Sequence, residues 1–219
     1  MAARLTCIIC FCILYTLPVL AEEGDATRRF KIAKYEDGNQ LPLKKSEILT
    51  DIKVKENIQY YDIDGLTESD LLAQMKLNGT KWNDGKVYAA LTSWNIRYDY
   101  DITLLEGRYY ISSIKTDVDI VFQLPRLVSS ARRPATLTDA WKTYLGNLTK
   151  HEDGHRDIAV STGQEIYQIL ASIGSFTTGS ELDAEARRLV KAKLQRLKQA
   201  QMEYDTETRH GKTQGAVLM

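Results

Sequence analysis

Two runs of the chain alternate hydrophobic and polar residues with a period of two. One face of the first run carries Trp94, Ile96, Tyr98, Tyr100 and Ile102, and one face of the second carries Thr116, Val118, Ile120, Phe122 and Leu124. Glu106-Gly107, between the two runs, is typical of a turn. The pattern predicts an antiparallel sheet with one buried face and one solvated face.

A strand and a short helix are predicted before this sheet. Residues 57–63 have the composition of a strand, which Asp64-Gly65 ends. Thr67 and Asp70 then form a helix N-cap pair, and Asn78-Gly79 ends that helix.

Helical periodicity begins after a stretch bracketed by Pro125 and Pro134, which we interpret as a boundary between two lobes. Thr138 is the expected N-cap of a helix that ends near Gly174, and Ser180 is the expected cap of a second helix. The apolar face of the first helix contains Trp141, Leu145, Leu148, His155, Ile158, Thr162, Ile166 and Leu170. The predicted fold class is α+β: an N-terminal antiparallel sheet with a short helix, followed by two long helices.

Composition suits one globular domain. Of 219 residues 43% are hydrophobic, and the 29 basic residues balance the 29 acidic ones, so nothing indicates a nucleic-acid partner. We predict a flexible lead over 22–45, with a short strand near Phe30, and one domain over 46–219. Within it, the β-rich lobe covers 46–125 and the helical lobe 135–211.

The N-terminus has the features of a secretory signal. Arg4 precedes an apolar run from Cys7 to Leu20, and Ala21 is a suitable last residue before cleavage. We therefore predict a signal peptide over 1–21 and a periplasmic or secreted product without stable membrane insertion; the alternative is a retained anchor. The three cysteines of the chain all lie in this segment, so the mature chain would have no thiol ligand or nucleophile.

The strongest chemical signal is His151-Glu152-Asp153-Gly154-His155, inside the first long helix. Histidines at i and i+4 share one helical face and can bind one metal ion. Glu152, next to the first histidine, is placed to act as general base on a zinc-activated water. The alternative interpretation is a solvated helix face that carries two histidines and an acid.

A catalytic zinc ion usually has three protein ligands. The third histidine of the chain, His210, follows the second helix and is the leading candidate. Asp205, Glu181 and Glu185 are alternative third ligands. The alternative for His210 is that it is an exposed histidine near the C-terminus with no role in metal binding. Ile158 and Ser161 occupy the positions where metzincins carry glycine and their third histidine, which excludes that class.

Further residues have expected supporting roles. Asp157 and Asp205 are candidates for orienting the ligand imidazoles. Tyr204 or Arg209 could stabilise an oxyanion. Strand 92–102 is the candidate edge for an extended peptide.

Three segments together resemble a known bacterial family. They are the His-Glu-x-Gly-His helix, the segment Tyr204-Asp-x-x-Thr-x-His-Gly and the strand Thr92-Ser93-Trp94. The chain resembles, over about residues 57 to 215, the predicted secreted zinc-dependent proteases, a family of unknown function grouped with the zincin-like metallopeptidases. The resemblance implies His151, His155 and His210 as zinc ligands and Glu152 as the catalytic residue.

The function expected from these observations is an exported zinc-dependent metallopeptidase of the HExxH type, acting on a protein or peptide. Two alternatives stay open: a zinc-dependent hydrolase of cell-wall amide or peptide bonds, and a non-catalytic zinc-binding envelope protein. The sequence does not indicate an oligomeric state.

Overall fold

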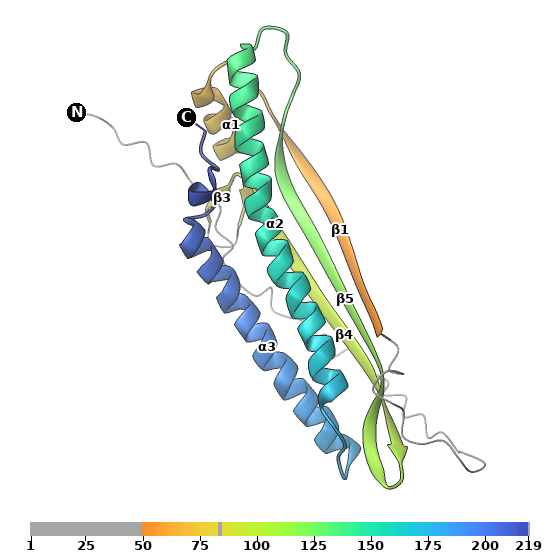
Figure 1. Cartoon of the computed structure of the whole chain (residues 1–219). Coiled ribbons are helices and arrows are strands. Elements are labelled where there is room, and N and C mark those ends of the chain that lie inside the picture. Colours follow the sequence, from red (N-terminus) through yellow and green to blue (C-terminus); the bar gives the residue numbers. More distant parts are fainter. Residues whose placement is uncertain (1–49, 83–84, 219) are drawn as a thin grey trace.

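Three long strands form the main sheet, in the order β1-β5-β4 (Figure 1). They are β1 (Thr50–Ile63), β4 (Leu91–Leu105) and β5 (Arg108–Leu127). The computed structural model describes residues 50–82 and 85–218. The predicted signal peptide and the whole of the predicted flexible lead, with its strand near Phe30, therefore lie outside the described residues.

The predicted antiparallel pair is confirmed, but the sheet as a whole is mixed. β4 and β5 form a long hairpin whose turn is Glu106-Gly107, with φ of 50° and 73°. The described part of β1, in contrast, runs parallel to β5 along the whole of its length. The predicted α+β fold class is confirmed. The parallel pairing of β1 was not predicted, because residue periodicity does not specify a strand's partner.

The predicted lobe boundary at Pro125 falls inside β5, opposite Tyr61 of β1. The central strand tolerates this proline because β4 begins at Leu91, which lies opposite Gln123. Beyond Gln123, β5 has β1 as its sole neighbour in the described sheet, so a missing N–H on the β4 side breaks no ladder hydrogen bond.

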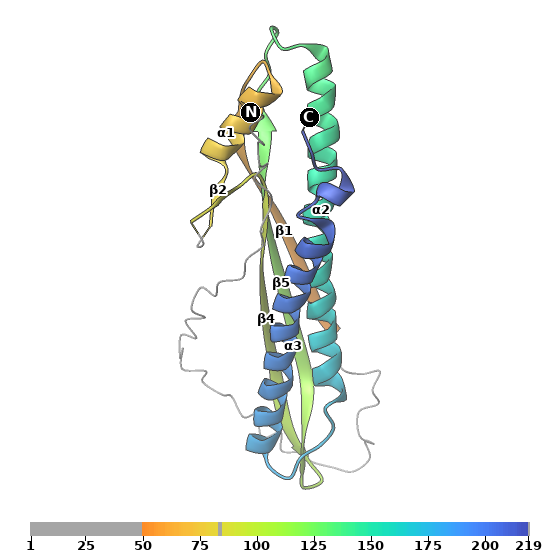
Figure 2. The same ribbon diagram turned by 90° about the vertical axis from the view of Figure 1, so that its left-hand side faces the viewer.

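A small helix and a two-stranded sheet lie beside the upper end of the main sheet (Figure 2). Helix α1 (Glu68–Asn78) begins with the predicted capping box between Thr67 and Asp70, and ends at Gly79. Strands β2 (Thr80–Lys81) and β3 (Val87–Tyr88) pair antiparallel.

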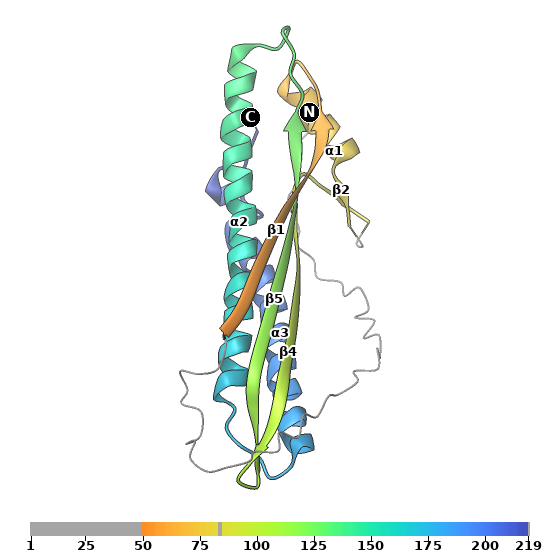
Figure 3. The ribbon, with the colours of Figure 1, turned by 90° about the vertical axis from the view of Figure 1, so that its right-hand side faces the viewer.

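Two long helices follow the sheet and run side by side along it (Figures 1 and 3). They are α2 (Ala135–Ser172) and α3 (Gly179–Thr208), and a short 3₁₀ helix, η1 (Lys212–Gln214), comes after them. The predicted N-cap residues of both helices were wrong, because each helix begins a few residues earlier in the sequence. Pro134, not Thr138, precedes α2 with the φ of −58° that suits a helix start, and Thr178, not Ser180, forms a capping box with Glu181 at the start of α3.

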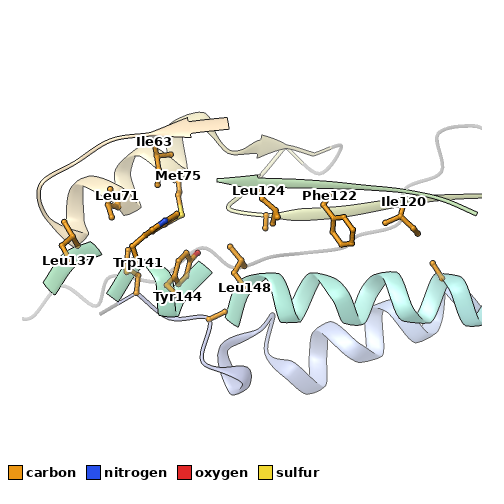
Figure 4. Packing of buried hydrophobic residues seen from close by; sticks show 14 of the residues in the cluster. Ile63, Leu71, Met75, Ile120, Phe122, Leu124, Leu137, Trp141, Tyr144 and Leu148 are labelled. Carbon is orange, nitrogen blue, oxygen red and sulfur yellow. The ribbon is translucent and has the colours of Figure 1, made fainter. Parts of the chain in front are cut away.

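The hydrophobic core lies between α2 and the face of β5 that carries its even-numbered residues. Its members extend from Leu137 and Trp141 on α2 to Ile120, Phe122 and Leu124 on β5 (Figure 4). Gly163 allows close contact here, because a Cβ atom at this position would lie 2.5 Å from a Val118 methyl group. Among the described residues, no helix is both long and apolar enough to cross a membrane.

Candidate metal centre

The middle of α2 carries three buried polar side chains. His151, Glu152 and His155 each have 0% of their surface exposed, so the interpretation as a solvated helix face is wrong. The two imidazoles lie one helical turn apart, and their Nε2 atoms are separated by 3.3 Å. Burial of three polar groups in one turn requires partners from other elements.

Asp205 of α3 completes a close group with the two histidines. Its Oδ1 lies 3.3 Å from His151 Nε2 and 3.2 Å from His155 Nε2. Among the described residues, these three side chains form a group whose possible ligand atoms all lie within 4.8 Å of one another. A tetrahedral zinc site with bonds of about 2.0–2.1 Å has ligand–ligand edges of about 3.3–3.4 Å. The three side chains therefore fit three corners of such a site.

The carboxyl of Asp205 is held in its ionised form. Burial raises the pKa of Asp205, but hydrogen bonds from His151, His155 and His210 outweigh burial and hold that pKa well below its usual range. A metal cation bound among these nitrogen and oxygen atoms would favour the same ionised carboxylate.

Two glutamines orient the imidazoles from behind. Gln201 Oε1 lies 2.5 Å from His155 Nδ1, and Gln214 Oε1 lies 3.0 Å from His151 Nδ1. An amide oxygen can only accept, so both histidines donate from Nδ1 and turn Nε2 toward Asp205. Sequence reasoning missed both glutamines. Gln201 could have been found from its spacing of four residues before Asp205, which places both on one face of α3.

Tyr204 packs across the ligand helix at Gly154. Its ring stacks on His151 at 5.1 Å between centroids, and its hydroxyl donates to the His151 carbonyl over 3.2 Å. Burial raises the pKa of Tyr204, which keeps the hydroxyl a neutral donor. A Cβ atom on Gly154 would lie 2.1 Å from this hydroxyl. The glycine in the motif is thus explained by the close approach of Tyr204.

We expect Gly154→Ala to lower the free energy of unfolding by about 1–3 kcal/mol, because the new methyl group overlaps the tyrosine ring. Gly146→Ala is the matched control on the same helix. A Cβ there meets nothing within 4 Å, so this variant should gain up to about 1 kcal/mol from helix propensity. Urea unfolding of both variants measures the difference, and equal stabilities would refute the proposed contact.

His210 lies beside the group of His151, His155 and Asp205, on a turn whose backbone is in the left-handed conformation. Arg209, His210 and Gly211 have φ values of 49°, 55° and 78°, a conformation that costs energy for the two non-glycine residues. This turn returns the chain toward α2 and leaves His210 Nδ1 3.3 Å from Asp205 Oδ1, with 19% of the side chain exposed. His210 is not in the close group of three, and its role as third ligand stays a prediction.

The other candidate residues lie elsewhere. Glu181 belongs to the capping box of α3, and Glu185 pairs with Arg188 on the exposed surface. Twenty residues of helix, about 30 Å, separate Glu185 from Asp205, so neither glutamate is the third ligand. Asp157 is exposed and pairs with Arg156, so it does not orient an imidazole. Arg209 is also exposed.

Glu152 is held by the sheet. The Thr92 hydroxyl, near the start of β4, donates to Glu152 Oε2 over 2.7 Å. Thr92 is itself buried, with 4% of its surface exposed. The strand segment Thr92-Ser93-Trp94 therefore contributes to the site through its first residue, a role that the sequence did not reveal.

Comparison with protein families gives one match. Residues 58–211 match the family described as a bacterial protein of unknown function (DUF922). The match covers more than half of the chain. The chain belongs to this family. No curated protein and no solved structure matches the chain. The description of the DUF922 family states no activity. A functional argument for this member therefore rests on the close group of His151, His155 and Asp205.

Proposed function

We propose that the chain is an exported zinc-dependent hydrolase that cuts peptide bonds, with His151, His155 and Asp205 as its metal ligands. The observation that supports this most is the triangle of two imidazole nitrogens and one carboxylate oxygen, with edges of 3.2–3.3 Å. Two histidines and one carboxylate are a common ligand set of catalytic zinc, and three protein ligands leave a position for water.

Each residue has a distinct task in the proposed reaction. When bound, zinc supplies a water of lowered pKa and polarises the carbonyl of the substrate. Glu152 accepts the proton of the attacking water and returns it to the departing amine. Thr92 fixes one oxygen of the Glu152 carboxylate, while Gln201 and Gln214 fix the imidazoles.

The position of Thr92 favours an extended polypeptide as the substrate. β4 is an edge strand of the described sheet, and Thr92 links it to Glu152. A polypeptide added to the outer edge of β4 would therefore run past Glu152. The single residue Thr92 thus connects the proposed substrate edge with the proposed base.

Thr92→Val should lower kcat about ten- to hundredfold, because the isosteric side chain no longer fixes Glu152. The amount of bound zinc should not change. Thr92→Ser is the matched control and should retain most of the activity, because it keeps the hydroxyl. Steady-state kinetics and metal analysis of both variants test whether Thr92 positions Glu152. Equal rates for the valine and serine variants would exclude that positioning role.

The experiment that tests the proposed function uses the purified full chain, loaded with one equivalent of zinc. It is incubated with an unfolded polypeptide and, separately, with peptidoglycan. We expect internal cleavage of the polypeptide. Cleavage of peptidoglycan alone would favour the cell-wall hydrolase instead, and bound zinc with no cleavage of either substrate would favour the non-catalytic zinc-binding protein.

A further inference from the structure

Much of strand β1 is not covered by the two long helices that pack on the sheet. In Figure 1, α2 runs beside β5, and the middle of β1 lies farther from both long helices than β5 does. Every residue of β1 from Lys53 to Tyr60 is exposed. Within the described residues, β1 has β5 as its only neighbouring strand. Its other edge is therefore the outer edge of the described sheet.

The exposed part of β1 carries an apolar stripe on the helix side of the sheet. Val54, Ile58 and Tyr60 are 42%, 48% and 51% exposed. In the parallel register they lie beside Val118, Phe122 and Leu124, all of which are buried in the core. Glu56, between them, approaches Arg156 of α2, which confirms that this face looks toward the helices. The stripe is thus a continuation of the core face that α2 leaves uncovered.

We propose that this strand is a dimerisation surface, where β1 pairs antiparallel with β1 of a second copy. An exposed edge strand with apolar side chains is a template for strand addition. Pairing two identical strands around a two-fold axis would give one continuous six-stranded sheet, and it would bring both apolar stripes together. This proposal is independent of the metal centre.

The available length of β1 determines the register. At one end of β1, the side-chain amide of Asn78 on α1 donates to the Asp62 carbonyl. That carbonyl is therefore not available to a second strand. The stretch that carries the apolar stripe runs from Val54 to Tyr60, and its midpoint is Asn57. A two-fold axis at Asn57 places Val54 opposite Tyr60 of the second copy.

The same register avoids electrostatic repulsion. It places Lys55 opposite Gln59 of the second copy, and Glu56 opposite Ile58 of the second copy. Shifting the axis by one residue, to Glu56, would place two carboxylates directly opposite each other, which is destabilising. Shifting the axis the other way, to Ile58, would place Val54 opposite Asp62, whose carbonyl already accepts from Asn78. Self-pairing at Asn57 is therefore favoured over both neighbouring registers. With seven residues per strand the interface is small, so we expect a dissociation constant of roughly micromolar size.

Sedimentation velocity of the full chain over a concentration series tests the proposal. We expect the mass to double as the concentration rises through this range. Ile58→Glu should weaken the dimer at least about tenfold, because the new carboxylate faces Glu56 of the second copy. Leu77→Glu is the control, since Leu77 on α1 is also an exposed apolar residue, at 75%, and should leave the dimer unchanged.

A cysteine pair tests the register. In a full chain whose Cys7, Cys10 and Cys12 are replaced by serine, Asn57→Cys should form a disulfide dimer on mild oxidation, because opposed residues of antiparallel strands lie within disulfide distance. Gln59→Cys should not, since it faces Lys55. A monomer at all concentrations, an unaffected Ile58→Glu variant or equal cross-linking at both positions would each overturn the proposal.

Discussion

Glu152→Gln is expected to lower peptide hydrolysis by about a hundredfold to ten-thousandfold, the range that a general base contributes. The amide keeps the size of the carboxylate and can still accept the hydrogen bond from Thr92, so the buried position should remain filled. It cannot accept the proton of the attacking water. The zinc content should stay at one per chain, because Glu152 is not one of the three grouped ligands.

Glu165→Gln is the matched control for this variant. Glu165 lies on the same helix but is partly exposed and pairs with Lys193 of α3, away from the metal group. Its replacement should leave hydrolysis within about twofold of the original rate, since partly exposed ion pairs contribute little. Full activity of Glu152→Gln, or equal losses in both variants, would contradict the assignment of Glu152 as the base.

Asp205→Ala is expected to have the largest effect on metal binding. The carboxylate is the anionic member of the group, and its loss leaves two neutral imidazoles as ligands. Zinc affinity should therefore fall by more than the roughly 10–100-fold that loss of an outer contact costs. His210→Ala should stay within that smaller range, because His210 contacts the oxygen of Asp205.

Zinc titration of the two variants separates the two candidates for the third ligand. Thermal unfolding without metal shows whether each variant is folded before its affinity is compared. Loss of zinc from His210→Ala together with retention by Asp205→Ala would return the role of third ligand to His210 and contradict the ligand set proposed here.

Local periodicity and capping explain why much of the fold could be predicted. Alternation at residues 94–102 and 116–124 specified the β4–β5 hairpin, and Thr67 with Asp70 specified the start of α1. The parallel pairing of β1 could not be predicted, because alternation does not identify the neighbour of a strand. Pro125 was misleading for a related reason: whether a proline fits a strand depends on where the next strand begins.

The ligand residues on α2 could be predicted from the sequence, whereas the contribution of α3 could not be singled out. His151 and His155 were visible because both lie on one helix with a spacing of four residues. Asp205 could only be named as one of several alternatives, since its distance from α2 depends on how α3 packs against α2. Gln201, Gln214 and Thr92 act through contacts between separate elements, for which a single sequence carries little signal.

The dependence of hydrolysis on stoichiometric zinc tests the central claim most directly. The full chain is stripped with a chelator, and cleavage of an unfolded polypeptide is followed as zinc is returned. The proposed centre of His151, His155 and Asp205 requires activity to vanish in the stripped chain and to be restored at one equivalent of zinc. Hydrolysis that survives complete removal of the metal, or that is absent at every zinc concentration, would contradict it.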